Sequence, residues 1–208
     1  MTRNLDALDR VAAAMELVGV RYAFVGGATI ELFLDALGQA QARATDDVDC
    51  IVDVTDRGAF YALEAGLRRA GFVNGIEPGD PVCRWRLGDL VVDVMPTDGA
   101  VLGFSNPFYR AALDAADVVL PSGRAVPCLT LGYTVATKVV AFEGRGQADP
   151  WVSKDLEDLV AIFDSWAGRC RGRVAGRRAS THRDLGFDIR AEQACARTGR
   201  GAHCRTWS

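Results

Sequence analysis

Along most of the chain, apolar positions either recur with the spacing of a helix or form the short runs that are typical of strands. Apolar side chains recur every three to four residues over 5–18, which predicts a helix. The same criterion, read with capping and breaker residues, predicts four more helices, at 28–37, 56–70, 130–143 and 152–166. Short apolar runs predict strands at 21–25, 48–54, 82–87 and 89–95, and shorter ones near 117–120 and 124–128. This order predicts an α/β (α+β) fold with a mixed β-sheet flanked by helices and two C-terminal helices that close over a site.

Two glycines follow the apolar run that ends at Val25 and predict a tight turn into the next helix. Because they have no Cβ atom, the backbone amides of Gly26 and Gly27 can approach a phosphate closely. A Gly-Gly pair is equally suited to a purely structural turn. The sequence contains neither GxxxxGK nor GxGxxG, so the main rival phosphate motifs are excluded.

Three aspartates are candidates for a metal site. Asp47 and Asp49 are two positions apart at the start of a predicted strand, so their side chains point to one face, about 7 Å apart. Both carboxylates can therefore reach a pair of divalent ions about 4 Å apart. Asp93 lies among valines in a later predicted strand and supplies a third carboxylate. We expect these three to bind Mg²⁺ or Mn²⁺, with solvated strand-end acids as the alternative.

Four motifs in order resemble those of the nucleotidyltransferase superfamily. The Gly-Gly turn, the Asp-x-Asp pair and the lone Asp93 resemble the superfold. More narrowly, Arg43-x-Thr45-x-Asp47-x-Asp49 is similar to the first motif of the AbiEii/AbiGii (MenT-like) toxin family. The stretch from Lys138 to Arg145 is similar to that family's Lys-x-x-Ala-hydrophobic-x-x-Arg helix, and the stretch 154–159 to its basic-Asp-x-x-Asp-hydrophobic motif. Together these motifs span about residues 20–165.

The resemblance implies an NTP substrate, a tRNA or other RNA acceptor and a cognate antitoxin. It also implies two sets of site residues. The nucleotide-binding residues would be Gly26, Gly27, Thr29, Arg43, Thr45, Lys138 and Arg145. The catalytic residues would be Asp47, Asp49, Asp93, Lys138, Asp155 and Asp158, of which the first three would hold the metal.

The last two motifs also have structural explanations. Lys138 and Arg145 are seven residues apart, two helical turns, so they share one stripe. On a largely apolar stripe they reach either a bound triphosphate or water. Asp155 follows Ser153, a suitable N-cap, and an acid in the first helical turn is favoured by the helix dipole. Asp158 lies one turn later, where that explanation does not hold.

Composition is that of a globular protein, with 49% hydrophobic and 25% charged residues. No apolar run approaches the roughly 20 residues of a membrane helix, and the N-terminus lacks a signal pattern. We therefore expect a cytoplasmic protein that does not bind membranes. The six cysteines form no Cys-x-x-Cys pair, so a zinc cluster is not expected.

The net charge of −3 is unevenly distributed. Residues 1–168 carry a net charge of −10, and residues 169–208 carry +7, with ten arginines. We expect a nucleotidyltransferase core over 1–128, a helical region over 129–168 and an arginine-rich, disordered tail over 169–208, where apolar periodicity fails. The tail is either an arm that binds RNA or an altered terminus without a selected role.

The expected function is metal-dependent transfer of a nucleoside monophosphate from an NTP to a hydroxyl, with RNA as acceptor in a toxin-antitoxin system. Two alternatives stay open. The first is transfer to a small molecule such as an antibiotic, which fits the negative charge of residues 1–168 better than RNA does. The second is a catalytically inactive nucleotide-binding or partner-binding module of the same fold.

Overall fold

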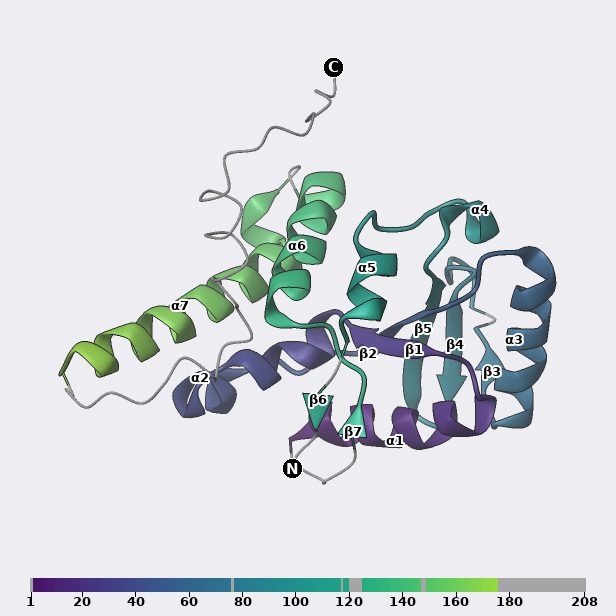
Figure 1. Cartoon of the computed structure of the whole chain (residues 1–208), viewed down its shortest axis with the longest axis horizontal. Coiled ribbons are helices and arrows are strands. Elements are labelled where there is room, and N and C mark those ends of the chain that lie inside the picture. Colours follow the sequence, from purple (N-terminus) through teal and green to yellow (C-terminus); the bar gives the residue numbers. More distant parts are fainter. Residues whose placement is uncertain (1, 76, 117, 120–124, 147–148, 176–208) are drawn as a thin grey trace, which may run out of the picture. The chain divides into compact units, whose positions relative to one another are not determined.

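A computed structural model describes residues 2–75, 77–116, 118–119, 125–146 and 149–175 (Figure 1). The chain divides into two compact units, 1–171 and 172–208, and the first contains every candidate site residue. The described helices and helical turns are α1 (Arg3–Val18), η1 (Gly27–Phe33), α2 (Ala36–Gln41), α3 (Arg57–Arg69), α4 (Gly99–Leu102), α5 (Tyr109–Asp114), α6 (Leu131–Ala141), η2 (Phe142–Gly146), η3 (Pro150–Val152) and α7 (Lys154–Ala175).

A five-stranded mixed sheet forms the centre of this unit, in the order β1-β2-β5-β4-β3. Only β2 and β5 run parallel; the other neighbours are antiparallel. A separate two-stranded sheet pairs β6 with β7. The strands are β1 (Tyr22–Val25), β2 (Asp47–Val52), β3 (Val73–Asn74), β4 (Arg84–Leu87), β5 (Leu90–Pro96), β6 (Val118–Val119) and β7 (Ala125–Val126).

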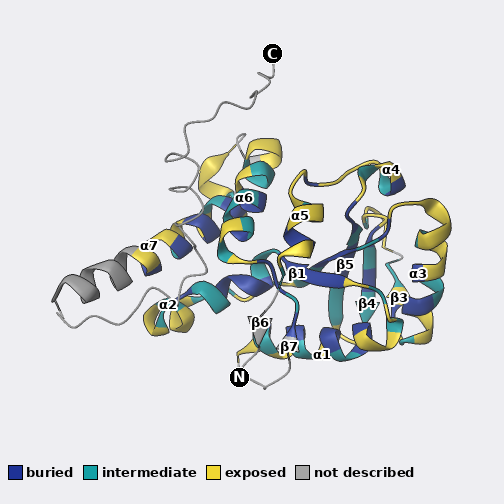
Figure 2. Cartoon of the chain, in the orientation of Figure 1, coloured by how far each residue is buried: buried dark blue, intermediate teal, exposed yellow. Residues whose placement is uncertain are grey.

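The two faces of the large sheet differ in chemistry, because successive side chains of a strand point to opposite faces. One face packs its apolar side chains, such as Val48 and Val92, against α1 and α3 in the main core. The opposite face carries a smaller apolar cluster that includes Ile51 and residues of α5. Asp49 and Asp93 alternate with core residues and so lie on this second face. Figure 2 shows the buried residues along β1 and on one side of α1.

The predicted fold class is confirmed, since a mixed sheet is flanked by helices. The predicted single helix over 28–37 is wrong. A 3₁₀ helix, η1, ends at Phe33, and Leu34 is extended with ψ of 154°. Asp35 then caps a new helix, α2, by accepting a hydrogen bond from the Gly38 amide at 2.8 Å.

Three further differences concern element ends and short elements. Helix α6 ends at Ala141 and continues as a π-helical turn, η2, which carries Arg145. Helix α7 continues to Ala175, whereas the predicted helix ended at 166. The short elements β3, α4 and α5 were not predicted, because they are too short for a periodic pattern.

The described residues also show the polarity of the helices and the state of three cysteines. None of the described helices is both long and apolar enough to cross a membrane. Cys50 and Cys128 are buried free thiols, as is Cys83. Residues 176–208, which hold most of the predicted tail, lie outside the described residues.

Candidate active site

The sheet register brings three charged residues of three strands into one row. Asp49 of β2 lies directly opposite Asp93 of β5, and Asp93 lies directly opposite Arg84 of β4. Neighbouring side chains in such a row point to the same face. Asp47, two residues before Asp49, lies on this face as well, and its side chain is 43% exposed. The three predicted metal ligands are therefore on one face of the sheet.

The Gly26-Gly27 turn is fitted closely to this row. Gly26 has a φ of +81°, and a Cβ there would lie 2.0 Å from Asp49 Oδ2. A Cβ on Gly27 would lie 2.6 Å from the Thr45 methyl group. Both contacts are too short for any side chain, so glycine is required at each position for this approach. The turn predicted to cover phosphates thus lies directly against one of the predicted metal ligands.

Asp49 carries a strongly perturbed carboxyl group. Burial raises its pKa to about 7, with further contributions from the negative charges of Asp47 and Asp93. The positive charges of Lys138 and Arg145 oppose this increase. The negative charges of the three carboxylates are therefore not fully balanced by the nearby positive charges. A bound cation would stabilise this arrangement.

Asp93 already has a cationic partner, which the sequence analysis did not identify. Arg84 Nε donates to Asp93 Oδ1 at 2.9 Å and Arg84 Nη2 donates to Asp93 Oδ2 at 2.8 Å. This is a bidentate pair, the strongest common geometry between a guanidinium and a carboxylate. A signal for it existed in the sequence: the two-residue turn at Gly88-Asp89 fixes the register that places Arg84 opposite Asp93.

The carboxylates fit a divalent metal ion at Asp47 and Asp49. These are oxygen ligands of the kind that Mg²⁺ prefers, and the charge crowding at Asp49 favours a cation there. Both oxygens of Asp93 are engaged by Arg84. The described part of the chain contains no group of three or more His, Cys, Asp or Glu side chains arranged to hold a metal ion.

A second cluster joins α6, η2 and α7 through buried ion pairs. Lys138 Nζ lies 3.0 Å from Asp155 Oδ1 and 2.6 Å from Asp158 Oδ2. Arg145 Nε donates to Asp155 Oδ2 at 2.9 Å, although the arginine side chain is 75% exposed. The Lys138 side chain is only 9% exposed, so it does not extend to water as one explanation required.

The ionised form of Asp155 is stabilised in this cluster. Burial alone would raise the pKa of Asp155, but the hydrogen bond from Arg145 and the charge of Lys138 outweigh it and lower the pKa below its ordinary value. Ser153 Oγ accepts a hydrogen bond from the Leu156 amide at 3.4 Å, so Asp155 lies in the first turn of α7 as expected. Asp155 therefore has the first-turn position that the helix dipole favours, and it also makes ion pairs that the sequence did not predict.

The remaining predicted residues are Arg43, Thr45 and Thr29, of which Arg43 contacts the second cluster. Arg43 Nη2 donates to Asp158 Oδ1 at 3.4 Å. Thr45 Oγ1 donates to the Asp47 carbonyl at 3.0 Å, and its amide donates to Asn4 Oδ1 at 3.1 Å. Thr29 is fully buried, and its hydroxyl donates to the Gly26 carbonyl at 2.9 Å. Thr29 and Thr45 therefore shape the turn and the first strand; direct phosphate contacts by them remain a prediction.

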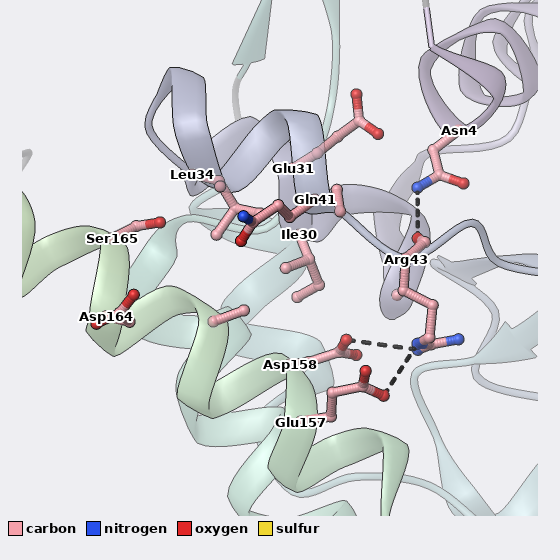
Figure 3. Close-up of a pocket in the computed structure, with 14 residues that line it drawn as sticks. Asn4, Ile30, Glu31, Leu34, Gln41, Arg43, Glu157, Asp158, Asp164 and Ser165 are labelled. Atoms are coloured by element: carbon pink, nitrogen blue, oxygen red, sulfur yellow. Dashed lines mark hydrogen bonds and ion pairs between the residues drawn. The ribbon is translucent and has the colours of Figure 1, made fainter.

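A polar cavity of about 150 Å³ lies beside the second cluster, between η1, α2 and α7 (Figure 3). Gly27, Arg43 and Asp158 line it, so it adjoins the glycine turn. In Figure 3, Arg43 points toward Asp158 and Glu157 at one end of the cavity. The lining also includes the acids Glu31 and Asp164, which makes this cavity unsuited to phosphate groups.

Tyr109 is a further residue near the row that the sequence analysis missed. Burial raises the pKa of its phenol, and the charge of Asp49 adds to the increase. The hydroxyl donates to Met95 Sδ at 3.7 Å. Tyr109 begins α5, a six-residue helix whose pattern is too short to be recognised in the sequence.

No protein-family model matches the chain. One curated protein, the imidazole glycerol phosphate synthase subunit HisF of Thermococcus gammatolerans, is 31% identical over 88 residues, which is 41% of this chain. The chain spans about a third, 35%, of that protein's length. This partial match assigns no activity to the chain.

Solved structures share the fold. The antibiotic-resistance factor ANT(2'')-Ia in solution is similar with a TM-score of 0.52 and 20% identity, covering 82% of this chain and 92% of that one. ANT(2'')-Ia crystallised with adenylyl-2''-tobramycin gives 0.52 and 19%, covering 84% and 97%. An antigenic nucleotidyltransferase-like protein from Paracoccidioides brasiliensis gives 0.50 and 17%, covering 82% and 90%. The chain therefore has a nucleotidyltransferase fold, whereas membership of the AbiEii/AbiGii toxin family is not confirmed.

Proposed function

We propose that the protein transfers a nucleoside monophosphate from an NTP to a hydroxyl group. The observation that carries this proposal is the placement of Asp49 and Asp93 in one row, with the Gly26-Gly27 turn directly against Asp49. The charges of Lys138 and Arg145 act on Asp49, so the cationic cluster lies close to that row. The shared fold of ANT(2'')-Ia, crystallised with a nucleotidylated product, supports the same chemistry.

Asp47 and Asp49 would hold the metal ion, which would supply positive charge to the phosphates when bound. The Gly26-Gly27 turn would position the phosphates, since its amides can approach them closely. An acceptor oxygen then attacks the α-phosphorus in line. A new O–P bond forms, the bond from the α-phosphorus to the bridging oxygen breaks, and pyrophosphate leaves with that electron pair.

Asp93 would accept the proton of the attacking hydroxyl, because it is the acid of the row furthest from the glycine turn. Lys138 and Arg145 would stabilise the leaving pyrophosphate. Asp155 pairs with both of these cations, and Asp158 pairs with Lys138. We therefore assign them a positioning role, in place of the direct catalytic role that the motif resemblance implied.

Two acceptor classes are supported by separate observations. An RNA acceptor, with a toxin role and a cognate antitoxin, is supported by the motif resemblance. Residues of its separate motifs do meet in space, since Asp158 pairs with Arg43 and Lys138, and Asp155 pairs with Lys138 and Arg145. A small hydroxylated acceptor is supported by the likeness to ANT(2'')-Ia over nearly that protein's whole length. The charge of residues 1–168 also favours the small acceptor, because an acidic surface repels RNA.

The test is incubation of the full chain with Mg²⁺ and each α-labelled NTP in turn. Total RNA and a set of aminoglycosides serve as the two acceptor pools. We expect label from at least one NTP to move to one pool, which identifies donor and acceptor class together. Label that moves to neither pool, while the NTP still binds, would instead support a nucleotide-binding module without transfer activity.

A further inference from the structure

The guanidinium group of Arg84 lies between Asp93 and Asp47 on one side and Asp80 on the other. Its Nε and Nη2 atoms donate to both oxygens of Asp93, and Nη2 also lies 3.8 Å from Asp47 Oδ2. On the other side, Nη1 lies 3.6 Å from Asp80 Oδ1. One guanidinium therefore faces three carboxylates, two of which are predicted metal ligands.

The surrounding backbone is fitted to this arginine. The Gly75 amide donates to the Arg84 carbonyl at 2.9 Å. A Cβ on Gly75 would lie 3.1 Å from Arg84 Cγ and 2.8 Å from Asp80 Oδ2, so the backbone at Gly75 packs closely against both side chains. Asp80 is itself held by the Glu77 amide, which donates to Asp80 Oδ2 at 3.1 Å. Arg84 is therefore held at its backbone carbonyl by Gly75 and at its guanidinium group by Asp80.

A fixed positive charge at this place competes with a metal ion. A divalent ion shared by Asp47 and Asp93 would lie beside the guanidinium, and like charges at such short range in a partly buried site repel strongly. The Arg84 side chain is only 26% exposed, so water screens this repulsion incompletely. Asp47 and Asp49 could still bind a metal ion, because Asp49 lies beside the glycine turn and away from Arg84.

We propose that Arg84 takes the place of a second divalent ion: the site binds one metal ion, on Asp47 and Asp49, and Arg84 positions Asp93 for the acceptor hydroxyl. This inference rests on the proposed nucleotidyl transfer. Each carboxylate oxygen has a second lone pair that Arg84 does not use, so Asp93 remains able to accept the hydroxyl proton while the O–P bond forms and pyrophosphate leaves. Arg84 exchanges no proton and acts only through Asp93.

The first test counts metal ions. Mn²⁺ is titrated into the full chain without nucleotide, and free Mn²⁺ is quantified by electron paramagnetic resonance. We expect one site per wild-type chain and two in Arg84→Met, because removal of the guanidinium leaves three crowded carboxylates to share a second ion. Arg84→Lys keeps the charge and should retain one site. Arg86→Met is the matched control and should also retain one, since Arg86 lies on the same strand and pairs with Glu77 instead.

Two sites in the wild-type chain would overturn the inference, and this result needs no variant to fold. A single site in folded Arg84→Met would overturn it as well.

The second test measures pyrophosphate release. Arg84→Met should lower kcat by about 10²-fold with little change in the KM for NTP. Equal losses of kcat in Arg84→Met and Arg86→Met would contradict a positioning role. If the wild-type chain transfers to no acceptor, the proposed function fails, while the Mn²⁺ count still decides whether Arg84 excludes a second ion.

Discussion

Lys138 shows how a single residue links stability to the site. It is one of two lysines in the chain, and its amine is buried between Asp155 and Asp158. A buried charge is tolerated only when it is paired, so the three side chains depend on one another. The phosphate role proposed for Lys138 therefore cannot be separated from its role in holding α6 against α7.

Lys138→Met should lower the free energy of unfolding by up to about 3–5 kcal/mol, because it removes the cation that two buried carboxylates share and leaves them only Arg145 and Arg43 as partners. Urea unfolding at neutral pH measures this loss. Lys154→Met is the control, since Lys154 is exposed at the start of α7. Similar small losses in both variants would show that the buried ion pairs contribute little.

Asp155 predicts a pH dependence of stability with a defined sign. Its pKa is lowered in the folded state, relative to an unfolded value of about 3.9. Ionised Asp155 therefore contributes stability that is fully present above the unfolded pKa and is lost as pH falls through the folded pKa. The stability difference between wild type and Asp155→Asn should be constant above about pH 5 and shrink below pH 4. Urea unfolding from pH 7 to pH 3 measures it, and a difference independent of pH would contradict the assignment.

At the scale of elements, the turn between β1 and η1 has a geometry that a substitution can test. Gly26 and Gly19 both have a positive φ, +81° and +73°, but only Gly26 approaches another side chain. Gly19→Ala should cost about 1–3 kcal/mol from backbone strain alone. Gly26→Ala should cost more and abolish transfer, because its Cβ would overlap Asp49 Oδ2.

Comparison of the two variants by urea unfolding and pyrophosphate release isolates the contact with Asp49. If both variants lost the same free energy of unfolding and both still transferred nucleotide, the contact between the turn and Asp49 would have no role in stability or transfer. Gly19 lies at the C-terminal end of α1, where a Cβ would meet no atom within 4 Å, so it reports strain without a clash.

The elements whose bounds the sequence predicted most closely are those with long patterns. The helix over 5–18 and the strand over 48–54 have clear periodicity, and α1 and β2 match them closely. The helix predicted over 28–37 failed because Asp35 capping and the extended Leu34 outweigh a continuous apolar pattern. The break after Ala141 into η2 was also not visible, since nothing in local propensity distinguishes a π turn from a helix end.

The candidate site was predicted in part for the same reason. Alternation along one strand placed Asp47 and Asp49 on one face, and this needed no knowledge of neighbouring strands. Arg84 could have been found from the Gly88-Asp89 turn, which fixes the register between β4 and β5. The ion pairs of Lys138 required the packing of α6 on α7, which is tertiary structure that a single-sequence pattern does not contain.

At the scale of the whole molecule, charge distribution bears on the acceptor. Residues 169–208 carry ten arginines, and residues 176–208 lie outside the described part of the chain. If this terminus has no selected role, a chain ending at Ala175 should bind RNA as the full chain does, with the same salt dependence. Binding isotherms at two salt concentrations test this. A marked loss of affinity with a flatter salt dependence would instead indicate an RNA-binding arm, because arginine-phosphate contacts release counterions.

The central claim is that the carboxylate row performs metal-dependent nucleotidyl transfer, and the most direct measurement is pyrophosphate release by Asp49→Asn. The wild-type chain, with Mg²⁺, an NTP and an acceptor pool, should release pyrophosphate. Asp49→Asn should be slower by roughly 10²-fold or more, with an unchanged or higher melting temperature because charge repulsion with Asp47 and Asp93 is relieved. The control Asp46→Asn, at an exposed neighbouring position, should leave the rate unchanged. Release by folded Asp49→Asn at the wild-type rate would contradict the claim.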